Sequence, residues 1–410
     1  MGIFEKFFVR NTAGSNEQGH FPDVVLHKKK ILEILHKTSR PVFLAEKRIL
    51  LDRYDRLENA LKQNWKKYQI AYSLKTNYDI ARSRIFQSQG AWAEVVSGYE
   101  YVLAKRLGFS GSEIICNGPI KRDNELIAAV QQNALVHIDN QDELLRVMRL
   151  GRILKDKARL GLRISTLLPS GKTSRFGFSV PNGEALAAVR LLHSSHIRLK
   201  SIHLHIGSDV DSVDSYQKAA KLMALFCNEV ERIQKFPVSC IDMGGGFPAD
   251  GKAPYGYGHW SSKPISDYIQ AIAYSLRRYL ARPNTKTLVV EPGRYLVDNA
   301  VIFITRIYNV NRCNGVIQVL TDGSVTLLPL SYYRPQIVKV YSPLCIRKTG
   351  DSLHGIIYGA TCQENDMLYE GGLPKDISIG DYVVYYSVGA YNSSMGNRFI
   401  TGYNKPTIFI

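Results

Sequence analysis

Short apolar runs alternate with longer amphipathic stretches from about residue 41 onward. The short runs are rich in β-branched residues and have the length of strands, whereas the longer stretches repeat apolar residues at helical spacing. Helical patterns include residues 100–107, 142–150, 184–192 and 215–234. The predicted strands are residues 70–76, 91–97, 112–117, 134–139, 158–164, 199–206, 238–243 and 286–291. Eight strands with helices between them predict an α/β fold, a (β/α)8 TIM barrel.

The pattern changes after Arg294, where strand-like runs follow one another without regular helices between them. These runs are residues 301–304, 315–320, 337–341, 355–358 and 382–386. They predict a mostly β domain at the C-terminal end of the chain. A helix near residues 24–38 is expected to pack against this domain. We therefore expect a barrel at residues 41–293 and a β-rich domain formed by residues 1–40 and 294–410.

Composition narrows the class of protein. The 410 residues leave room for two domains, and no apolar run approaches the roughly 18 residues of a membrane span. The formal charge of +17 would suit a polyanionic partner, but the basic residues are dispersed and Lys28–Lys30 is the one tight run. The six cysteines form no CxxC pair, which favours reduced thiols over disulfides or zinc. We expect a cytoplasmic enzyme without a metal that binds neither nucleic acid nor membrane.

The predicted barrel strands all end in polar residues or glycine. Because the carboxyl ends of barrel strands meet at one face, these residues are expected to form a single site. An amine, a carboxylate, an aromatic ring and a glycine turn are the groups needed to hold pyridoxal 5′-phosphate (PLP). The sequence therefore predicts a PLP enzyme. The strand-end residues are Lys75, Glu94, Asn117, Asp139, Arg163, His205, Gly244–Gly246 and Glu291.

Seven short motifs resemble one known family, in the family's own order. They are Tyr-x-x-Lys-x-Asn at 72–77, Glu-x-x-Ser-x-x-Glu at 94–100, His-x-Gly-Ser at 205–208, Gly-Gly-Gly-Phe at 244–247, Glu-Pro-Gly-Arg at 291–294, Thr-Cys-x-x-x-Asp at 361–366 and Gly-Ala-Tyr at 389–391. The family is the fold-type III PLP-dependent decarboxylases, built on an alanine-racemase-type barrel. It includes diaminopimelate, ornithine and arginine decarboxylases. Residues 328–332 are most similar to the branch that serves siderophore biosynthesis.

The resemblance implies a role for each barrel residue. Lys75 would form the Schiff base with PLP, and Glu291 would keep the pyridine nitrogen protonated so that the ring can accept electrons. Arg163 would support Glu291 from a neighbouring strand, and His205 would stack on the ring. His203 would share the strand face of His205, and a packing role is its default.

The resemblance also implies a phosphate site and a site shared between subunits. The cofactor-binding set is Lys75, Glu94, Arg163, His205, Ser208, Gly244, Gly245, Gly246, Glu291, Gly293, Arg294 and Tyr391. Glycine amides and an arginine fork suit the phosphate. Cys362 of the partner subunit would assist reprotonation, which requires a homodimer, although a cysteine is more often a small buried apolar residue.

The residue after Cys362 bears on the substrate. Diaminopimelate decarboxylases usually place Glu there and ornithine decarboxylases Asp, whereas this chain has the neutral Gln363, with Tyr332 and Glu364 as further substrate-binding candidates. Losing a charged contact to a buried ammonium costs about 1.5–3 kcal/mol. We therefore expect an amino-acid conjugate whose distal amine is acylated, such as a citryl-diamino acid. Glu364 could replace the carboxylate if the loop shifts by one residue.

Three other functions stay open. The first is decarboxylation of a free basic amino acid, namely diaminopimelate, ornithine, lysine or arginine. The second is an amino-acid racemase on the same barrel, but racemases of the family usually set an arginine against the pyridine nitrogen where this chain has Glu291. The third is a non-catalytic regulator, against which the retention of Lys75, Arg294 and Cys362 argues.

Overall fold

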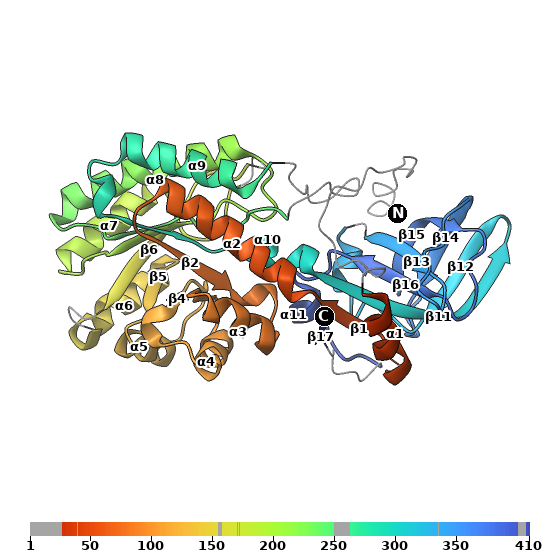
Figure 1. The fold of residues 1–410 in the computed structure, drawn as a ribbon. Coiled ribbons are helices and arrows are strands. Elements are labelled where there is room, and N and C mark those ends of the chain that lie inside the picture. Colours follow the sequence, from red (N-terminus) through yellow and green to blue (C-terminus); the bar gives the residue numbers. More distant parts are fainter. Residues whose placement is uncertain are drawn as a thin grey trace. The chain divides into compact units, whose positions relative to one another are not determined.

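The computed structural model describes residues 27–38, 40–154, 158–169, 171, 173–249, 263–334, 336–400 and 407–410. The chain divides into two compact units (Figure 1). A barrel unit contains residues 53–248 and 263–293, and a β unit contains the described residues up to Asp52 and from Arg294 onward, together with Ala249. Residues 41–52, expected in the barrel, group with the β unit because Val42–Ala45 pair there with residues 301–304.

The barrel unit is a closed ring of eight parallel strands, as predicted. Its order is β5-β4-β3-β2-β10-β9-β8-β6, and a pairing of β5 with β6 closes the ring. The short β7 (Phe178–Ser179) pairs with β6 outside it. The ring strands are β2 (Tyr68–Ser73), β3 (Trp92–Val95), β4 (Ile114–Cys116), β5 (Leu135–Ile138), β6 (Arg159–Ser165), β8 (Ser201–Leu204), β9 (Cys240–Asp242) and β10 (Thr287–Val290).

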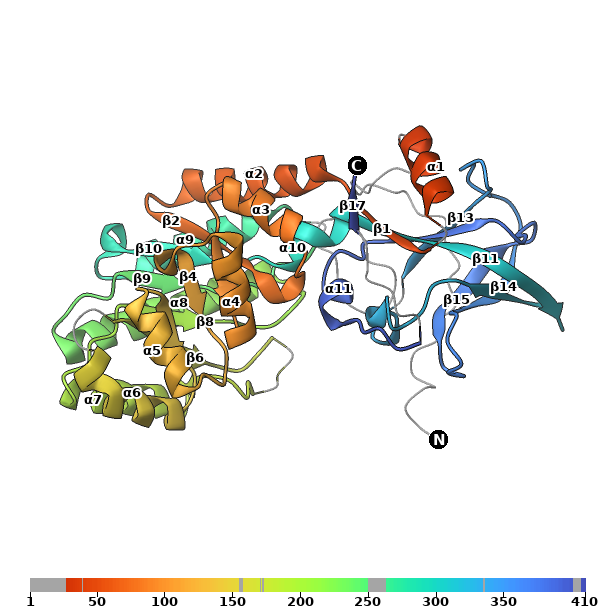
Figure 2. The same cartoon turned by 90° about the horizontal axis from the view of Figure 1, so that it is seen from below.

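Helices connect the strands and lie outside the ring; Figure 2 shows α4, α5 and α6 in this position. The helices around the barrel are α2 (Lys47–Asn64), α3 (Ile80–Ser88), α4 (Gly98–Leu107), α5 (Asp123–Gln131), α6 (Gln141–Leu154), α7 (Glu184–Ser194), α8 (Val213–Gln234) and α9 (Ile265–Tyr279). Their caps follow the sequence. Ser97, for example, accepts the backbone N–H of Glu100 at 3.2 Å, and Gly108 ends α4 with a positive φ of 97°.

An apolar layer fills the barrel two residues before six of the polar residues at the strand ends. It consists of Ala71, Ile115, Leu135 and Val289, with Trp92 and Cys240 packed against them. Side chains two residues apart on a strand point to the same face. The next layer along the strands is therefore formed by Ser73, Asn117, His137, Glu291, Glu94 and Asp242. The two-residue period of the strands thus places a polar layer directly after the apolar layer in the barrel interior.

The β unit is a mostly β sheet structure, also as predicted. Its sheet has the order β13-β16-β11-β12-β14-β15, and β1 pairs with β11 and β17. The strands are β1 (Val42–Ala45), β11 (Val301–Cys313), β12 (Val316–Thr321), β13 (Ile337–Tyr341), β14 (Ser352–Tyr358), β15 (Met367–Pro374), β16 (Tyr382–Tyr386) and β17 (Thr407–Phe409). Sequence patterning found five of these strands and missed β1, β15 and β17.

Helix α1 (Lys28–Lys37) packs on this sheet, as the sequence predicts for residues 24–38; residues 24–26 lie outside the described residues. Ile31 is fully buried in a cluster with residues from β1 and β11, including Leu44 and Ile302. Among the described residues, no helix combines the length and apolar character needed to cross a membrane.

Candidate active site

A chain of hydrogen bonds joins Lys75 to Glu291 across the polar layer of the barrel. Lys75 lies in a short 3-10 turn (Leu74–Thr76) at the end of β2, and its Nζ donates to Glu94 Oε2 at 2.5 Å. The Asn117 side-chain amide lies between the two carboxylates and donates to Glu94 Oε1 at 3.3 Å and to Glu291 Oε1 at 2.5 Å. The structure thus brings the predicted lysine and its two carboxylates into one network.

Glu94 and Glu291 are buried, whereas the Lys75 side chain is 36 % exposed. Ser73 Oγ also donates to Glu94, at 2.6 Å. The carboxylate of Glu94 is therefore held in place on strand β3 by strand β2 and can accept a proton from the Lys75 ammonium. The lysine is reachable from solvent while its charge partner is not.

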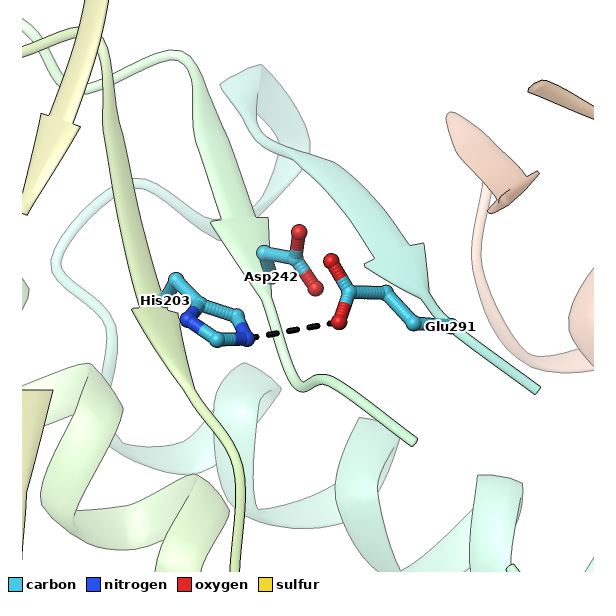
Figure 3. A group of neighbouring side chains, drawn as sticks. All are labelled: His203, Asp242 and Glu291. Atoms are coloured by element: carbon cyan, nitrogen blue, oxygen red, sulfur yellow. Dashed lines mark ion pairs between the residues drawn. The ribbon is translucent and has the colours of Figure 1, made fainter. Parts of the chain in front are cut away.

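Figure 3 shows His203, Asp242 and Glu291 pointing toward one another from three neighbouring strands. One ligand atom from each lies within 4.8 Å of the others. His203 Nε2 is 3.3 Å from Glu291 Oε2. Burial lowers the pKa of His203 well below its usual value, so this imidazole is neutral. In the part of the chain that the structure describes, no lysine or arginine pairs with Glu291. The basic side chain beside it is His203, which is uncharged.

The sequence left the role of His203 open, and its neighbours indicate a role in the network. Its ring stacks on that of His137, with centroids 4.9 Å apart. His137 is also neutral, since burial lowers its pKa well below the usual value. Its Nδ1 lies 2.6 Å from Asn117 Oδ1 and its Nε2 lies 2.8 Å from Ser201 Oγ. The Asn117 amide that bridges the two carboxylates is thereby fixed in orientation.

Arg163 does not support Glu291 in this structure. Its guanidinium pairs with Asp139 Oδ1 at 3.1 Å and lies over the Phe176 ring, 4.7 Å from the centroid. The expected contact is replaced because Asn117 and His203 occupy the neighbouring positions on Glu291. Arg163 lies on a ring strand as predicted, but that strand, β6, is separated from β10 by β8 and β9 and is not a neighbour of the strand that ends at Glu291.

His205 contacts the glycine turn. The Gly245 N–H donates to His205 Nδ1 at 3.1 Å, which leaves the ring proton of the neutral imidazole on Nε2. Desolvation, followed by the nearby positive charge of Lys75, lowers the pKa of His205 to about 3. His205 is therefore an uncharged aromatic ring at neutral pH. Ser208, three residues later in the same loop, is exposed.

The glycines of the turn are required by close approaches. A Cβ on Gly245 would lie 2.2 Å from the Glu291 carbonyl oxygen, and a Cβ on Gly246 would lie 2.2 Å from the Gly207 carbonyl oxygen. Gly244 and Gly246 have φ of +62° and +87°. The turn is tied to the strand end, since the Glu291 N–H donates to the Gly244 carbonyl at 2.8 Å. The Gly244 and Gly245 N–H groups donate to Asp242 Oδ1 and His205 Nδ1, and the Gly246 backbone at the end of the turn is partly exposed.

Gly293 is required for a similar reason. A Cβ there would lie 2.1 Å from Thr76 Oγ1, in the turn that carries Lys75. The residues that close β10 and the Lys75 turn are thus in contact, and the Ser73 N–H donates to the Pro292 carbonyl at 3.3 Å.

Within the β unit, Arg294 and Tyr391 lie together. The Arg294 guanidinium is 5.2 Å from the centroid of the Tyr391 ring, and Nη1 lies 3.3 Å from Asp298 Oδ2. Asp298 is fully buried and also accepts Arg334 Nη2 at 3.0 Å. Asp298 therefore orients Arg294, and Arg334 shares the negative charge. Sequence reasoning missed Asp298 and Arg334; the buried acidic residue four positions after Arg294 was the available signal.

The loop with Cys362 is anchored by Asp366. The Thr361 N–H and Oγ1 donate to Asp366 Oδ2 at 2.9 and 2.5 Å, and the Asp366 N–H donates to the Gln363 carbonyl at 3.0 Å. Cys362 and Glu364 are exposed. The 3-10 turn Pro329–Tyr332 of the same unit carries Tyr332, which is 47 % exposed. The predicted substrate residues of this unit are thus accessible to a partner molecule.

The barrel residues fit PLP. The buried Glu291 has no lysine or arginine partner within the described residues. The glycine turn packs too closely against backbone to admit a side chain, and Lys75 offers an amine beside a proton acceptor. A pyridinium nitrogen, a phosphate and an aldehyde are the complementary groups. Lys75, Glu291, His205 and Gly244–Gly246 would hold the cofactor.

Comparison with known proteins leads to the same chemistry. The family described as "Pyridoxal-dependent decarboxylase, pyridoxal binding domain" matches residues 51–298. The chain is 23% identical over 387 residues to the diaminopimelate decarboxylase of Methanocaldococcus jannaschii, covering 90% of this chain and 85% of that protein. It is 27% identical over 356 residues to the probable chloroplastic diaminopimelate decarboxylase of Oryza sativa subsp. japonica, covering 83% and 69%.

Solved structures with the same fold include a diaminopimelate decarboxylase from M. jannaschii in complex with L-lysine. It has a TM-score of 0.80 and 22% identity, covering 93% of this chain and 89% of that one. A lysine/ornithine decarboxylase from Vibrio vulnificus complexed with putrescine has a TM-score of 0.78 and 22% identity, covering 93% and 98%. These likenesses establish the barrel with its β domain.

Proposed function

Since the chain belongs to the pyridoxal-dependent decarboxylase family and is a PLP-dependent carboxy-lyase, we propose that it removes the α-carboxylate of a free basic amino acid, with diaminopimelate, lysine and ornithine as first candidates. The support for decarboxylation is the buried Glu291 carboxylate, linked to Lys75 and lacking a protein cation among the described residues. The support for the substrate class comes from relatives that are diaminopimelate decarboxylases.

The cofactor, when bound, supplies a ring that takes up the electrons released when the carboxylate leaves as carbon dioxide. Lys75 Nζ would bind its aldehyde carbon, and Glu94 Oε2, 2.5 Å away, would accept the proton that the ammonium must lose first. Glu291 would keep the ring nitrogen protonated. The neutral imidazole of His205 would pack on the ring without adding a charge.

A racemase is disfavoured by the same geometry. Glu291 occupies the place where racemases of this fold usually set an arginine, and Arg163, on β6 of the same ring, pairs with Asp139. A carboxylate at the ring nitrogen promotes full transfer of electrons into the ring, which suits loss of carbon dioxide.

A second candidate substrate is a conjugate whose distal amine is acylated, such as a citryl-diamino acid. The neutral Gln363 favours it, because the hydrogen bonds of Asp366 to Thr361 and Gln363 fix the loop register and oppose a one-residue shift that would replace Gln363 by Glu364. A missing carboxylate would weaken binding of a free distal ammonium by roughly ten- to a hundredfold. The siderophore branch depends on this candidate.

Carbon dioxide release by the PLP-loaded protein tests both. The panel contains free diaminopimelate, lysine, ornithine and arginine, and the citryl conjugates of diamino acids, with Lys75→Ala as the inactive control. We expect turnover of a free basic amino acid. Release of carbon dioxide from conjugates alone would overturn this proposal in favour of the second candidate. Release from none of the compounds would exclude both proposed substrate classes.

We further propose a homodimer with shared sites, in which Cys362 of the partner subunit completes the pocket. The exposure of Cys362 and Tyr332 in the β unit supports this arrangement. Mixing inactive Lys75→Ala and Cys362→Ala proteins under exchange conditions should restore part of the activity, because one mixed site is intact. No recovery in verified mixed dimers would contradict shared sites.

A further inference from the structure

Asp242 is a fully buried carboxyl group to which neither the sequence motifs nor the proposed chemistry gives a role. It ends strand β9, beside Glu291 and His203 (Figure 3). Its Oδ1 accepts the Gly244 N–H at 2.9 Å. Its Oδ2 is buried and meets no donor among the described residues.

The charges around Asp242 are unbalanced if both carboxyls are ionised. Two adjacent carboxylates in a desolvated site repel, so one of them takes up a proton. No lysine or arginine pairs with either group in the described part of the chain, and His203 is neutral. Each carboxyl accepts one hydrogen bond, Glu291 from the Asn117 amide at 2.5 Å and Asp242 from the Gly244 N–H at 2.9 Å. Asp242 is fully buried whereas Glu291 is 5 % exposed, and the more deeply desolvated carboxyl is the one that takes up the proton. The proton therefore belongs on Asp242.

The direction of the pKa shift agrees with this geometry. Burial, followed by the charge of Glu291 and a hydrogen bond to it, raises the pKa of Asp242 well above its usual value. The Oδ2 atom without a donor then becomes a hydroxyl that can donate, and the only unmet polar atom of this side chain is satisfied. The Gly244 N–H fixes which of the two oxygens carries the proton.

We propose that Asp242 is a neutral carboxylic acid that donates from Oδ2 to Glu291, so that the pair carries one negative charge to meet one protonated ring nitrogen. Asp242 is a positioning residue: it holds the Glu291 carboxylate with one oxygen and the phosphate-side glycine turn with the other. The inference rests on the proposed function for the identity of the cationic ring. The protonation state itself does not depend on that function.

A divalent cation among His203, Asp242 and Glu291 is the opposing interpretation, since their ligand atoms lie close enough to hold one. It requires both carboxyls to be ionised. The neutral acid and the cation site differ in whether Asp242 carries a proton. A substitution that imitates the neutral acid therefore distinguishes the two interpretations.

Asp242→Asn is that substitution. Its Oδ1 can accept the Gly244 N–H and its Nδ2 can donate to Glu291, which reproduces both contacts without an ionisable group. We expect the PLP dissociation constant to stay within about threefold of the parent and the absorbance of bound PLP to be unchanged from pH 6 to 9. Asp242→Ala removes the donor and should weaken PLP binding by roughly ten- to a hundredfold.

Infrared difference spectra of the apo proteins give a readout that needs no cofactor. The parent minus Asp242→Asn spectrum at pH 8 should contain the C=O stretch of a protonated carboxyl. Absence of that band overturns the proposal, as does Asp242→Asn losing PLP affinity as severely as Asp242→Ala. Stoichiometric divalent metal in the parent, lost in Asp242→Asn, overturns it as well. If the parent fails to bind PLP, the proposed function fails while the infrared result still decides the protonation state.

Discussion

Replacing Gly245 by alanine tests the coupling between the glycine turn and the end of β10. The added Cβ would lie 2.2 Å from the Glu291 carbonyl oxygen, a backbone atom that cannot rotate away. The turn and the strand end must separate by roughly 1 Å to reach ordinary contact, and a misplacement of this size commonly costs about 10²-fold in function. The separation also breaks or stretches the 2.8 Å bond from the Glu291 N–H to the Gly244 carbonyl.

Two energetic terms set the expected loss of stability. Overpacking a well-filled site costs about 1–3 kcal/mol, and the weakened backbone hydrogen bond adds about 1 kcal/mol. We therefore expect Gly245→Ala to lower the free energy of unfolding by about 2–4 kcal/mol. Its PLP dissociation constant should rise by about 10²-fold, because Glu291 and the turn move together.

Urea unfolding of the apo protein and fluorescence titration with PLP measure the two effects. Gly372→Ala on β15 is the control, because its Cβ would meet a side-chain atom, Ser352 Oγ, at 3.3 Å. The control should change stability by less than about 1 kcal/mol. The reasoning fails if Gly245→Ala matches the control in stability and binds PLP within threefold of the parent.

Two further outcomes follow from acidic side chains in the β unit. Arg334→Met leaves Arg294 as the one charged partner of the buried Asp298 among the described residues. It should lower the free energy of unfolding measured in urea by about 3 kcal/mol and should weaken PLP binding. Unchanged stability would contradict the role of the Arg334–Asp298 ion pair. Desolvation raises the pKa of Asp322 from 3.8 to about 6. The contribution of this group to the stability of the folded protein is therefore fully present below pH 4 and is lost as the pH rises through 6. Asp322→Asn should therefore gain about 2–3 kcal/mol at pH 7.5 and little at pH 4, and an equal change at both pH values would contradict this.

The barrel was accessible from the sequence because its signals are local. Each strand of the ring is a short apolar run between amphipathic stretches, and Lys75 and Glu291 follow such runs directly. In contrast, β15 was missed because Glu370, Gly371 and Gly372 interrupt its apolar pattern. The pairing of β1 with β11 was also missed, since it joins segments that are far apart in the chain.

The site was predicted in its parts and less well in its contacts. Strand ends placed Glu94 and Glu291 in one layer, but no pattern indicates that Asn117 bridges them. Arg163 was assigned to Glu291 because it lies on a strand of the same ring, whereas side-chain length and the position of Asp139 decide its partner. Protonation states are still less visible, because they depend on the burial of groups brought together from several strands.

The pairing of β1 sets an order for the folding of a nascent chain. This strand leaves the ribosome early, but its antiparallel neighbour is residues 301–304 and its parallel neighbour is residues 407–409. All ring strands of the barrel, in contrast, have been synthesised by residue 290. The barrel strands can therefore pair during translation, while Val42–Ala45 must wait for residues 301–304 to cover one edge and for residues 407–409 to cover the other.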